Sequence, residues 1–296
     1  MSTQFLTSKP HILIQLDTDP QPSVFDGVVA VDAGVDQLFQ YGQVSAESVE
    51  SLVHGAIFTR SPKDLRNTAI FVGGSNVPLG EKLLGTIQKA FFGPLRVSVM
   101  LDANGCNTTA AAAVLVAERH CPLLGTDVAV LAGTGPVGRR AALMLAEQGA
   151  KVHIGSRLLE RARQVCDDVR QQNNGEKLIP FETSTEEMLS THLDKVQIVI
   201  SAGAFGVQLM GADLWQSLAN LQVVVDLNAV PPMGIEEVEM SDQGETRSGV
   251  VCYGAIGVGG LKMKIHKQVI RKLFERNDQV LDAREIYEIG KEIVDV

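Results

Sequence analysis

Short apolar runs alternate along the chain with longer segments in which apolar residues recur with helical spacing. Most of the runs are continuously apolar, as expected of strands that are buried on both faces of a parallel sheet. Strand followed by helix, repeated along the chain, predicts an α/β fold with helices on both faces of each sheet. The expected strands are His11–Leu16, Gln37–Tyr41, Gly55–Thr59, Thr68–Val72, Arg96–Leu101, Asp127–Ala132, Lys151–Ile154, Lys177–Phe181, Val196–Ser201 and Val223–Leu227. The expected helices are Pro22–Ala33, Ala46–His54, Val77–Phe91, Thr108–Arg119, Pro136–Gln148, Leu158–Gln172, Thr185–His192, Ala212–Leu218, Leu261–Glu275 and Ala283–Val294.

The best candidate for a domain boundary lies just before or within Asn104–Asp127, where an alanine-rich helix is followed by a Cys121-Pro break and a new strand. We expect two α/β domains: a substrate domain of residues 1–106 plus 276–296, and a nucleotide-binding domain of residues 107–275. The last helix would then return to the first domain. A cleft between two such domains is a usual place for a small-molecule site.

Composition excludes several classes of protein. The 296 residues include 26 Lys and Arg against 35 Asp and Glu, a net charge of −9, which disfavours a nucleic-acid partner. No apolar run approaches the roughly 20 residues that span a bilayer, and the N-terminus lacks a signal-peptide pattern. The four cysteines and six histidines share no metal-ligand spacing, so we expect reduced thiols, no metal and a cytoplasmic location.

A glycine-rich motif lies between an expected strand and an expected helix. Its residues are Gly133, Thr134, Gly135, Pro136, Val137 and Gly138, in the spacing GxGxxG. The first glycine permits a tight turn, the second lets a pyrophosphate approach the backbone, and the third lets the helix lie close to the strand. The helix N-terminus favours the phosphate charge. In this context the motif predicts a Rossmann-type dinucleotide site, in preference to a simple tight turn.

The end of the following strand indicates which dinucleotide binds. An NAD site normally carries an acidic residue here, whereas this chain has Ser156 and Arg157, with Arg161 one turn later. A hydroxyl and two guanidinium groups suit a 2′-phosphate, so we predict NADP, with NAD also accepted. The alternative is that both arginines are solvated residues at a helix start. Residues that end later strands, expected to contact the ribose and nicotinamide, are Ser201, Ala202, Gly203 and Asn228.

Longer stretches in both halves of the chain carry a resemblance to a known family. They are Asp17-Thr-Asp19-Pro, Gly55-Ala-Ile-Phe-Thr-Arg60-Ser-Pro-Lys63, Leu101-Asp102-Ala-Asn104-Gly-Cys106-Asn107, the glycine motif, and Tyr253-Gly-Ala-Ile-Gly-Val-Gly-Gly260-Leu-Lys262. With these the chain resembles the NAD(P)-dependent methylenetetrahydromethanopterin dehydrogenases of methylotrophic bacteria, which are related to methylenetetrahydrofolate dehydrogenases. The resemblance implies a pterin-binding domain facing a Rossmann domain, a homo-oligomer, and hydride transfer from a reduced pterin one-carbon carrier to the nicotinamide.

Several residues of the first domain are candidates for the pterin site. Asp17, Asp19, Asp102 and Asn104 lie at expected strand ends, where a carboxylate would favour the cationic product, although each aspartate is equally suited to cap a helix or stabilise a turn. Lys262 follows a run of glycines that suits a flat ring, and would orient the pterin from the start of a helix. Its alternative is the polar stripe of a surface helix. We assign Asp102 and Lys262 to catalysis. Arg60 and Lys63 would pair with the acidic tail of the substrate, or form surface ion pairs.

Three other functions remain open from the sequence. A tetrahydrofolate carrier presents nearly the same pterin and one-carbon bridge. The stretch Ser156–Ala162 is similar to the phosphate clamp of shikimate and quinate dehydrogenases, but their Asn-Thr-Asp motif reads Asn107-Thr108-Thr109 here, without the acid. A non-catalytic NADP sensor would not need a second large domain with clustered polar residues.

Overall fold

The computed structural model describes residues 9–172 and 177–294, which fall into two compact units. Unit 1 comprises Met1–Thr108 and Met263–Ile289, and unit 2 comprises Thr109–Lys262 and Gly290–Val296. The expected division assigned residues 263–275 to the nucleotide-binding domain and 290–296 to the other. The structural units differ from it at these places, and at residues 107–108, because each unit boundary falls inside a continuous helix.

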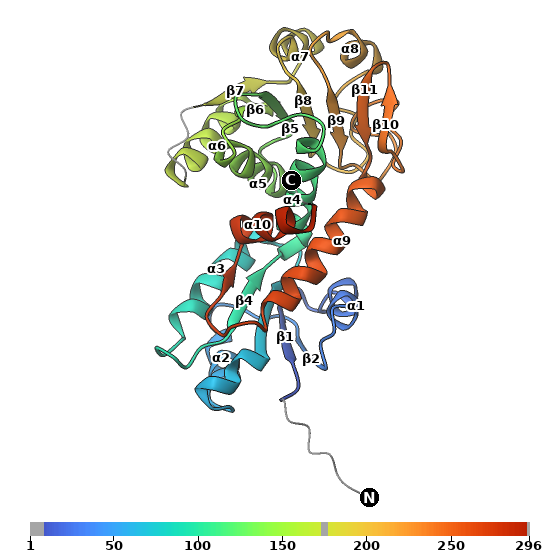
Figure 1. Ribbon diagram of the computed structural model, residues 1–296. Coiled ribbons are helices and arrows are strands. Elements are labelled where there is room, and N and C mark those ends of the chain that lie inside the picture. Colours follow the sequence, from blue (N-terminus) through green and yellow to red (C-terminus); the bar gives the residue numbers. More distant parts are fainter. Residues whose placement is uncertain (1–8, 173–176, 295–296) are drawn as a thin grey trace, which may run out of the picture. The chain divides into compact units, whose positions relative to one another are not determined.

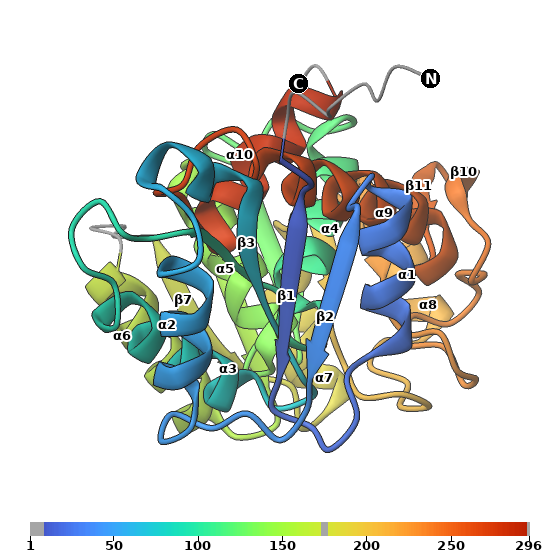
Figure 2. The ribbon, with the colours of Figure 1, turned by 90° about the horizontal axis from the view of Figure 1, so that it is seen from below.

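Unit 1 contains a five-stranded parallel sheet with the order β12-β4-β3-β1-β2. The strands are β1 (Ile12–Asp17), β2 (Gln37–Tyr41), β3 (Thr68–Gly73), β4 (Ser98–Leu101) and the short β12 (Val280–Leu281). The central strands β3 and β4 are buried along their whole length, which explains their continuous apolar sequence. Figure 2 shows β3, β1 and β2 side by side. The chain passes from β1 to β2 on one side and to β3 on the other.

The helices of unit 1 agree with the expected pattern except in one segment. They are α1 (Val24–Asp32), α2 (Val49–Ile57), the 3₁₀ turns η1 (Pro62–Asn67) and η2 (Ala103–Gly105), α3 (Val77–Lys89) and α10 (Ala283–Val294), whose last residues group with unit 2. The strand expected over Gly55–Thr59 is wrong, because α2 continues to Ile57. Val49, Val53, Ala56 and Ile57 are buried with helical spacing, and Gly55 does not break the helix.

Unit 2 contains a seven-stranded sheet with the order β10-β11-β9-β8-β5-β6-β7. The strands are β5 (Asp127–Leu131), β6 (Lys151–Ser156), β7 (Leu178–Glu182), β8 (Ile198–Ser201), β9 (Val223–Asp226), β10 (Gln243–Arg247) and β11 (Val250–Tyr253). Six of them are parallel in the Rossmann order, and β10 pairs antiparallel with β11 at the edge. The direction of winding reverses at β5, which is the strand that leads into the glycine motif.

The helices of unit 2 are α5 (Pro136–Glu147), α6 (Leu159–Gln172), α7 (Glu186–Leu193) and α8 (Ala212–Ser217). Helices α5 and α6 pack on β5, β6 and β7, as Figure 1 shows. Two further helices connect the units in sequence: α4 (Cys106–Glu118) leaves unit 1, and α9 (Ala255–Lys272) returns to it. No helix in the described residues is long and apolar enough to cross a bilayer.

The hairpin β10–β11 was not expected from the sequence. Its outer strand, Gln243–Arg247, is polar at every position but one glycine, so it lacks the apolar pattern of a strand. The sequence signal that was missed is the pair Ser248-Gly249 in the turn. In the structure both residues have positive φ, at 48° and 82°. Such a two-residue turn with both φ values positive suits the twist of a β-hairpin.

Helix α9 begins six residues earlier than expected, at Ala255 instead of Leu261. Gly257, Gly259 and Gly260 therefore form helix rather than a loop against a flat ring, and Gly254 directly precedes the helix. A Cβ on Gly254 would lie 2.0 Å from the carbonyl oxygen of Glu239, and one on Gly257 would lie 1.9 Å from that of Asp242. These glycines are required because the helix start packs directly on the backbone of residues 239–242.

Candidate functional site

The glycine motif of unit 2 has the geometry of a dinucleotide-binding turn. A Cβ on Gly138 would lie 2.7 Å from the Cα of Gly133, so the third glycine permits the contact between α5 and the loop. Gly135 is different, because a Cβ there meets nothing closer than 3.7 Å. It is the N-cap of α5, makes no side-chain cap, and is followed by Pro136 in the first turn. The N-terminus of α5 thus retains N–H groups for an anion, next to backbone that a ligand can approach closely.

A cavity of about 390 Å³ lies beside this turn. It brings the glycine motif together with the residues that follow β6, as expected for an adenosine and its phosphates. Its lining residues are Ala132, Thr134, Ser156, Arg157, Leu158, Arg161, Thr183 and Leu209. None of these is acidic, and Arg157 and Arg161 are both exposed. The residues present therefore fit a nicotinamide dinucleotide, and the arginines give the cavity a positive charge that suits a 2′-phosphate.

Four lining residues were not among those expected from the sequence. Ala132 and Leu158 are sequence neighbours of expected residues, whereas Thr183 and Leu209 lie outside the expected stretches. Thr183 directly follows β7, and its backbone N–H donates to the carbonyl oxygen of Ser156 at 2.9 Å, which brings its side chain beside Arg157 in the cavity wall. Leu209 lies against Gly203, where a Cβ would approach to 2.8 Å. Thr183 could have been predicted from a general rule, because the carboxyl ends of neighbouring parallel strands meet at one edge of the sheet. Nothing local in the sequence identifies Leu209.

The residues at the ends of β8 and β9 are brought to the same edge of the sheet, and the side chain of Asn228 is used by the protein itself. Ser201 is fully buried, and a Cβ on Gly234 would lie 2.4 Å from its Oγ. Asn228 accepts hydrogen bonds from the N–H groups of Gly206 and Val230 through Oδ1, and donates to the carbonyl oxygen of Pro232 at 2.9 Å. Asn228 thus holds the loop after β9 in shape. Ala202 and Gly203 remain partly exposed beside Gly135.

Asp226 is the last residue of β9, and its side chain also stabilises the loop after β9. Its carboxylate accepts hydrogen bonds from the N–H groups of Asn228 and Ile235, at 3.2 and 3.0 Å. Burial raises the pKa of Asp226 above its usual value, and these N–H donors offset part of that rise. Asp226 and Asn228 together fix both ends of the segment 228–235.

In unit 1, Asp17 and Asp19 connect the loops at the carboxyl edge of the sheet. Asp17 is buried and accepts hydrogen bonds from the N–H groups of Asp19 (2.9 Å) and Ser23 (3.1 Å). Asp19 accepts from the N–H and the hydroxyl of Ser75, both at 2.9 Å, and so joins the loops after β1 and β3. This geometry favours the turn-stabilising alternative for Asp17. Asp19 is half-buried and remains at the edge where a ligand would bind.

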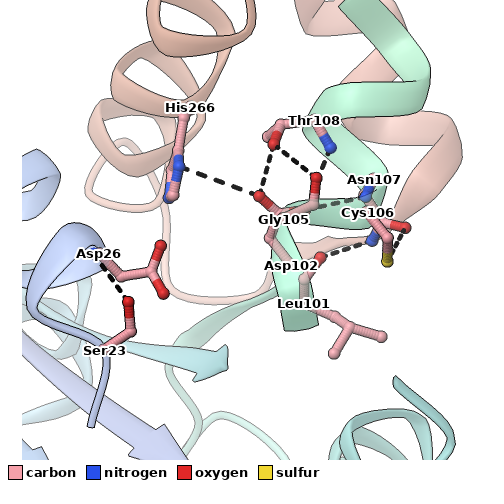
Figure 3. A network of polar contacts seen from close by, with 9 residues as sticks. All are labelled: Ser23, Asp26, Leu101, Asp102, Gly105, Cys106, Asn107, Thr108 and His266. Carbon is pink, nitrogen blue, oxygen red and sulfur yellow. Dashed lines mark hydrogen bonds and ion pairs between the residues drawn. The ribbon is translucent and has the colours of Figure 1, made fainter. Parts of the chain in front are cut away.

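Asp102 is the centre of a buried polar network, shown in Figure 3. Its Oδ1 accepts the N–H groups of Asn107 and Thr108 at 2.9 and 3.1 Å, and its Oδ2 accepts the Thr108 hydroxyl at 2.6 Å. The Nδ1 of His266 lies 3.9 Å from Oδ2, and both side chains are 0% exposed. The carboxylate therefore caps α4, which is the alternative considered for it, and this burial favours a positioning role over contact with substrate.

The remaining candidates of unit 1 lie at two opposite edges of its sheet. Asn104 is exposed at the carboxyl edge, with φ at 54°, and its N–H donates to the carbonyl oxygen of Gly74 at 2.7 Å. Arg60 instead donates to the carbonyl oxygens of Pro10 and Asn67, which lie just before β1 and β3 in the sequence. Lys63 is exposed on η1 at the same amino edge. The structure thus groups Asp19 with Asn104 and separates Arg60 and Lys63 from them.

Lys262 lies in the third turn of α9 and is half-buried. We expected it at the start of a helix, after a glycine loop, and the earlier start of α9 corrects that expectation. The residue lies where the chain leaves unit 2, one residue before unit 1 resumes. In residues 9–172 and 177–294 there is no cluster of three or more His, Cys, Asp or Glu side chains suited to a metal ion.

The cysteines offer a test of the packing in unit 2. Cys166 on α6 and Cys252 on β11 are buried, and burial raises the pKa of each thiol to about 11. At pH 8 only about one thiol in a thousand would be a thiolate, the form that reacts. A short pulse of iodoacetamide, followed by mass spectrometry, should label both residues in urea and neither in the native protein. Equal labelling of Cys252 in both conditions would contradict this packing.

Comparisons with known proteins agree with this division of the chain. Residues 24–104 match the family model described as the N-terminal part of methylene-tetrahydromethanopterin dehydrogenase. Residues 115–243 match the model described as shikimate / quinate 5-dehydrogenase. The second match covers the glycine motif and the cavity beside it.

Two curated proteins of Methylorubrum extorquens are similar over most of their length. "Bifunctional protein MdtA" is 42% identical over 95% of this chain and 98% of its own. "NAD(P)-dependent methylenetetrahydromethanopterin dehydrogenase" is 31% identical over 92% of this chain and 94% of its own. Among solved structures, shikimate 5-dehydrogenase of Listeria monocytogenes, in complex with shikimate and NAD, aligns over 99% of both chains with a TM-score of 0.54 and 14% identity. At that identity the likeness concerns the fold alone.

Proposed function

This chain belongs to the methylenetetrahydromethanopterin dehydrogenase family, and on that premise we propose that it transfers a hydride from methylene-tetrahydromethanopterin to NADP. The product would be methenyl-tetrahydromethanopterin, an intermediate of one-carbon metabolism. NAD is expected to serve as a poorer acceptor. Unit 1 would bind the reduced pterin carrier, and unit 2 would bind the nicotinamide dinucleotide.

The chemistry makes modest demands on the protein. The methylene carbon bridges two nitrogen atoms whose lone pairs stabilise the positive charge that develops as the hydride leaves. The substrate therefore assists its own oxidation, and no general base or metal is needed. The bound nicotinamide supplies the acceptor for the hydride. The residues of this chain mainly have to hold two rings in orientation, which is a large source of rate acceleration in reactions of this kind.

The choice of NADP rests on one observation, the acid-free cavity that contains Arg157 and Arg161. A carboxylate in this place would repel a 2′-phosphate, whereas guanidinium groups attract it. Gly133, Thr134, Gly135, Pro136, Val137 and Gly138 would cradle the pyrophosphate, and Ser156 with Arg157 and Arg161 would hold the 2′-phosphate. Ser201, Ala202 and Gly203 would lie along the ribose and nicotinamide, next to a loop that Asn228 supports.

On the pterin side we propose Lys262 as the residue that orients the substrate, with Asp19 and Asn104 contributing from the carboxyl edge of unit 1. Asp17 and Asp102 would act as positioning residues through the loop and the helix that they cap. We further propose a cytoplasmic homo-oligomer without a bound metal. Light scattering of the purified protein tests the oligomeric state, and metal analysis tests the absence of a metal.

A direct assay tests the proposed function. Purified protein is mixed with NADP and either methylene-tetrahydromethanopterin, methylene-tetrahydrofolate or shikimate, and the absorbance of the reduced nicotinamide is followed. We expect turnover with methylene-tetrahydromethanopterin, and the same assay gives the ratio to the folate carrier. Turnover with shikimate alone, or NADP binding without turnover of any of the three, would overturn the proposal.

A further inference from the structure

The outer wall of the nucleotide cavity of unit 2 is formed at the last strand of the sheet. Strand β7 stands at the end of the strand order and pairs with β6, so that Glu182 lies opposite Ser156. Thr183 directly follows β7 and lines the cavity, as does Ser156 at the end of β6. Because neighbouring strands are about 4.8 Å apart, Thr183 lies one strand spacing further from the glycine motif than Ser156 does. Thr183 is therefore within reach of a ligand group that extends past the end of β6.

Local packing uses the backbone and the methyl group of Thr183 but not its hydroxyl. Its N–H donates to the carbonyl oxygen of Ser156 at 2.9 Å. A Cβ on Gly155 would lie 3.0 Å from the Cγ2 of Thr183, so the methyl group packs beside Gly155 on the neighbouring strand. The next residue, Ser184, instead donates its hydroxyl to Oε1 of Glu182 at 2.6 Å and does not line the cavity. Thr183 therefore supplies the hydroxyl that this loop presents to the cavity.

The donors of this cavity are not used within the protein. Among the residues that the structure describes, the hydroxyl of Thr183 has no hydrogen-bond partner, and the guanidinium groups of Arg157 and Arg161 form no ion pair. Arg163, two residues further along α6, is different, because it forms an ion pair with Glu160 at 3.4 Å. The cavity thus combines two positive charges with a neutral O–H, and no acidic residue lines it to compensate them.

We propose that Thr183 is a specificity-determining residue, whose hydroxyl donates a hydrogen bond to the 2′-phosphate of NADP. This rests on the proposed function, in which NADP occupies the cavity. In NAD sites an acidic side chain at the end of the second strand of the Rossmann unit holds the ribose 2′-hydroxyl, and here the shorter Ser156 takes that place. A phosphate on the 2′-oxygen would extend past Ser156 toward the end of β7. Its three terminal oxygen atoms can accept from Thr183 as well as from the two arginines.

The alternative partner of the hydroxyl is the edge of the adenine ring, since Leu158 and Leu209 supply apolar surface for the faces of such a ring. Two observations favour the phosphate. The backbone of Thr183 is bonded to Ser156, the residue that would lie beside the ribose 2′-oxygen. The arginines of the cavity also lack an anion, and a hydroxyl that completes an anion site gains from the charge of its acceptor. Because adenine is common to NADP and NAD, the two possibilities differ in their effect on selectivity.

The binding of two adenosine nucleotides tests the proposal. Thr183→Val removes the donor and keeps the shape of the side chain, so the Kd of 2′,5′-ADP should rise about tenfold, while that of 5′-AMP, which lacks the 2′-phosphate, should change by less than about twofold. Thr183→Ser keeps the hydroxyl, and both Kd values should stay within about threefold of the wild type. Thr191→Val is the matched control and should change neither value, because the Thr191 hydroxyl donates to the carbonyl oxygen of Glu187 on α7 and does not line the cavity. Isothermal titration calorimetry gives the Kd values, and the thermal midpoint of each variant verifies that it is folded.

An equal loss of affinity for both nucleotides in Thr183→Val would assign the hydroxyl to the adenosine and overturn the proposal, and so would an unchanged Kd of 2′,5′-ADP. The measurement needs neither pterin nor turnover, so it is separate from the test of hydride transfer. A wild-type protein that binds 2′,5′-ADP no more tightly than 5′-AMP would count against NADP in this cavity, and with it against the role of Thr183. A wild-type preference for 2′,5′-ADP that survives in full in Thr183→Val would overturn the role of Thr183 alone.

Discussion

Replacing Arg157 by alanine should raise the KM of NADP about 30-fold and change kcat/KM with NAD by less than about twofold. A charge-assisted hydrogen bond to a phosphate is worth roughly 2 kcal/mol when partly open to water, and 1.4 kcal/mol corresponds to a factor of ten. NAD has no 2′-phosphate, so it loses nothing when the guanidinium is removed. Initial rates over a range of each dinucleotide, at a saturating concentration of the carrier, give both values.

The control for this experiment is Arg163→Ala. Arg163 lies on the same helix, two residues from Arg161, but forms an exposed ion pair with Glu160 at 3.4 Å and does not line the cavity. Its removal takes away the same charge without touching the cavity. If Arg157→Ala weakened NADP and NAD equally, or no more than Arg163→Ala does, the assignment of the 2′-phosphate to this cavity would be wrong.

The nucleotide-binding unit was largely predictable, because its chemistry depends on backbone geometry that is local in sequence. Gly133 and Gly138 contact each other across five residues, and the turn they form determines where the N–H groups of α5 point. To predict the cavity beside the turn, only one more element was required, the neighbouring strand β6 with Arg157 directly after its end. Thr183 was missed since its contribution depends on the register of β7 against β6, which joins Glu182 to Ser156.

The substrate unit was less predictable, because the role of each polar residue there depends on distant packing. Asp17 and Arg60 are both polar residues next to strands, and the sequence gives no sign that one lies at the carboxyl edge and the other at the amino edge. Glu47 and Lys82 are separated by 35 positions and meet only because α3 crosses beside the loop after β2. Such pairs become visible when the sheet order is known, and a single sequence does not provide that order.

Glycine had two opposite meanings in this chain, which explains the error at α9. In the motif at Gly133–Gly138, glycine marks a loop that a ligand approaches. At Gly254 and Gly257, glycine instead lets the start of α9 pack on backbone carbonyl oxygens, which would lie less than 2.1 Å from a Cβ at either position. The local sequence is similar in the two cases. The difference lies in the segment 239–242, which directly precedes the unexpected hairpin and packs on these two glycines.

Replacing Asp102 by alanine should lower the free energy of unfolding by about 3 kcal/mol, the largest effect on stability that we expect from a single polar residue. The change leaves the N–H groups of Asn107 and Thr108 and the Thr108 hydroxyl buried without the carboxylate that accepts them. A lost helix cap costs about 1 kcal/mol, and each unpaired buried donor adds about 1 kcal/mol or more. Urea unfolding followed by circular dichroism measures the change.

Asp102→Asn separates this positioning role from a catalytic one. The amide oxygen still accepts the two N–H groups, and the amide nitrogen donates to the Thr108 hydroxyl oxygen, so we expect a loss of about 1 kcal/mol and a kcat within about threefold of the wild type. A carboxylate that stabilised the developing methenyl cation would give the reverse result, because its charge is absent in asparagine while the cap is kept. A fall in kcat of a hundredfold with an unchanged urea midpoint would therefore return Asp102 to the reacting centre, in spite of its burial.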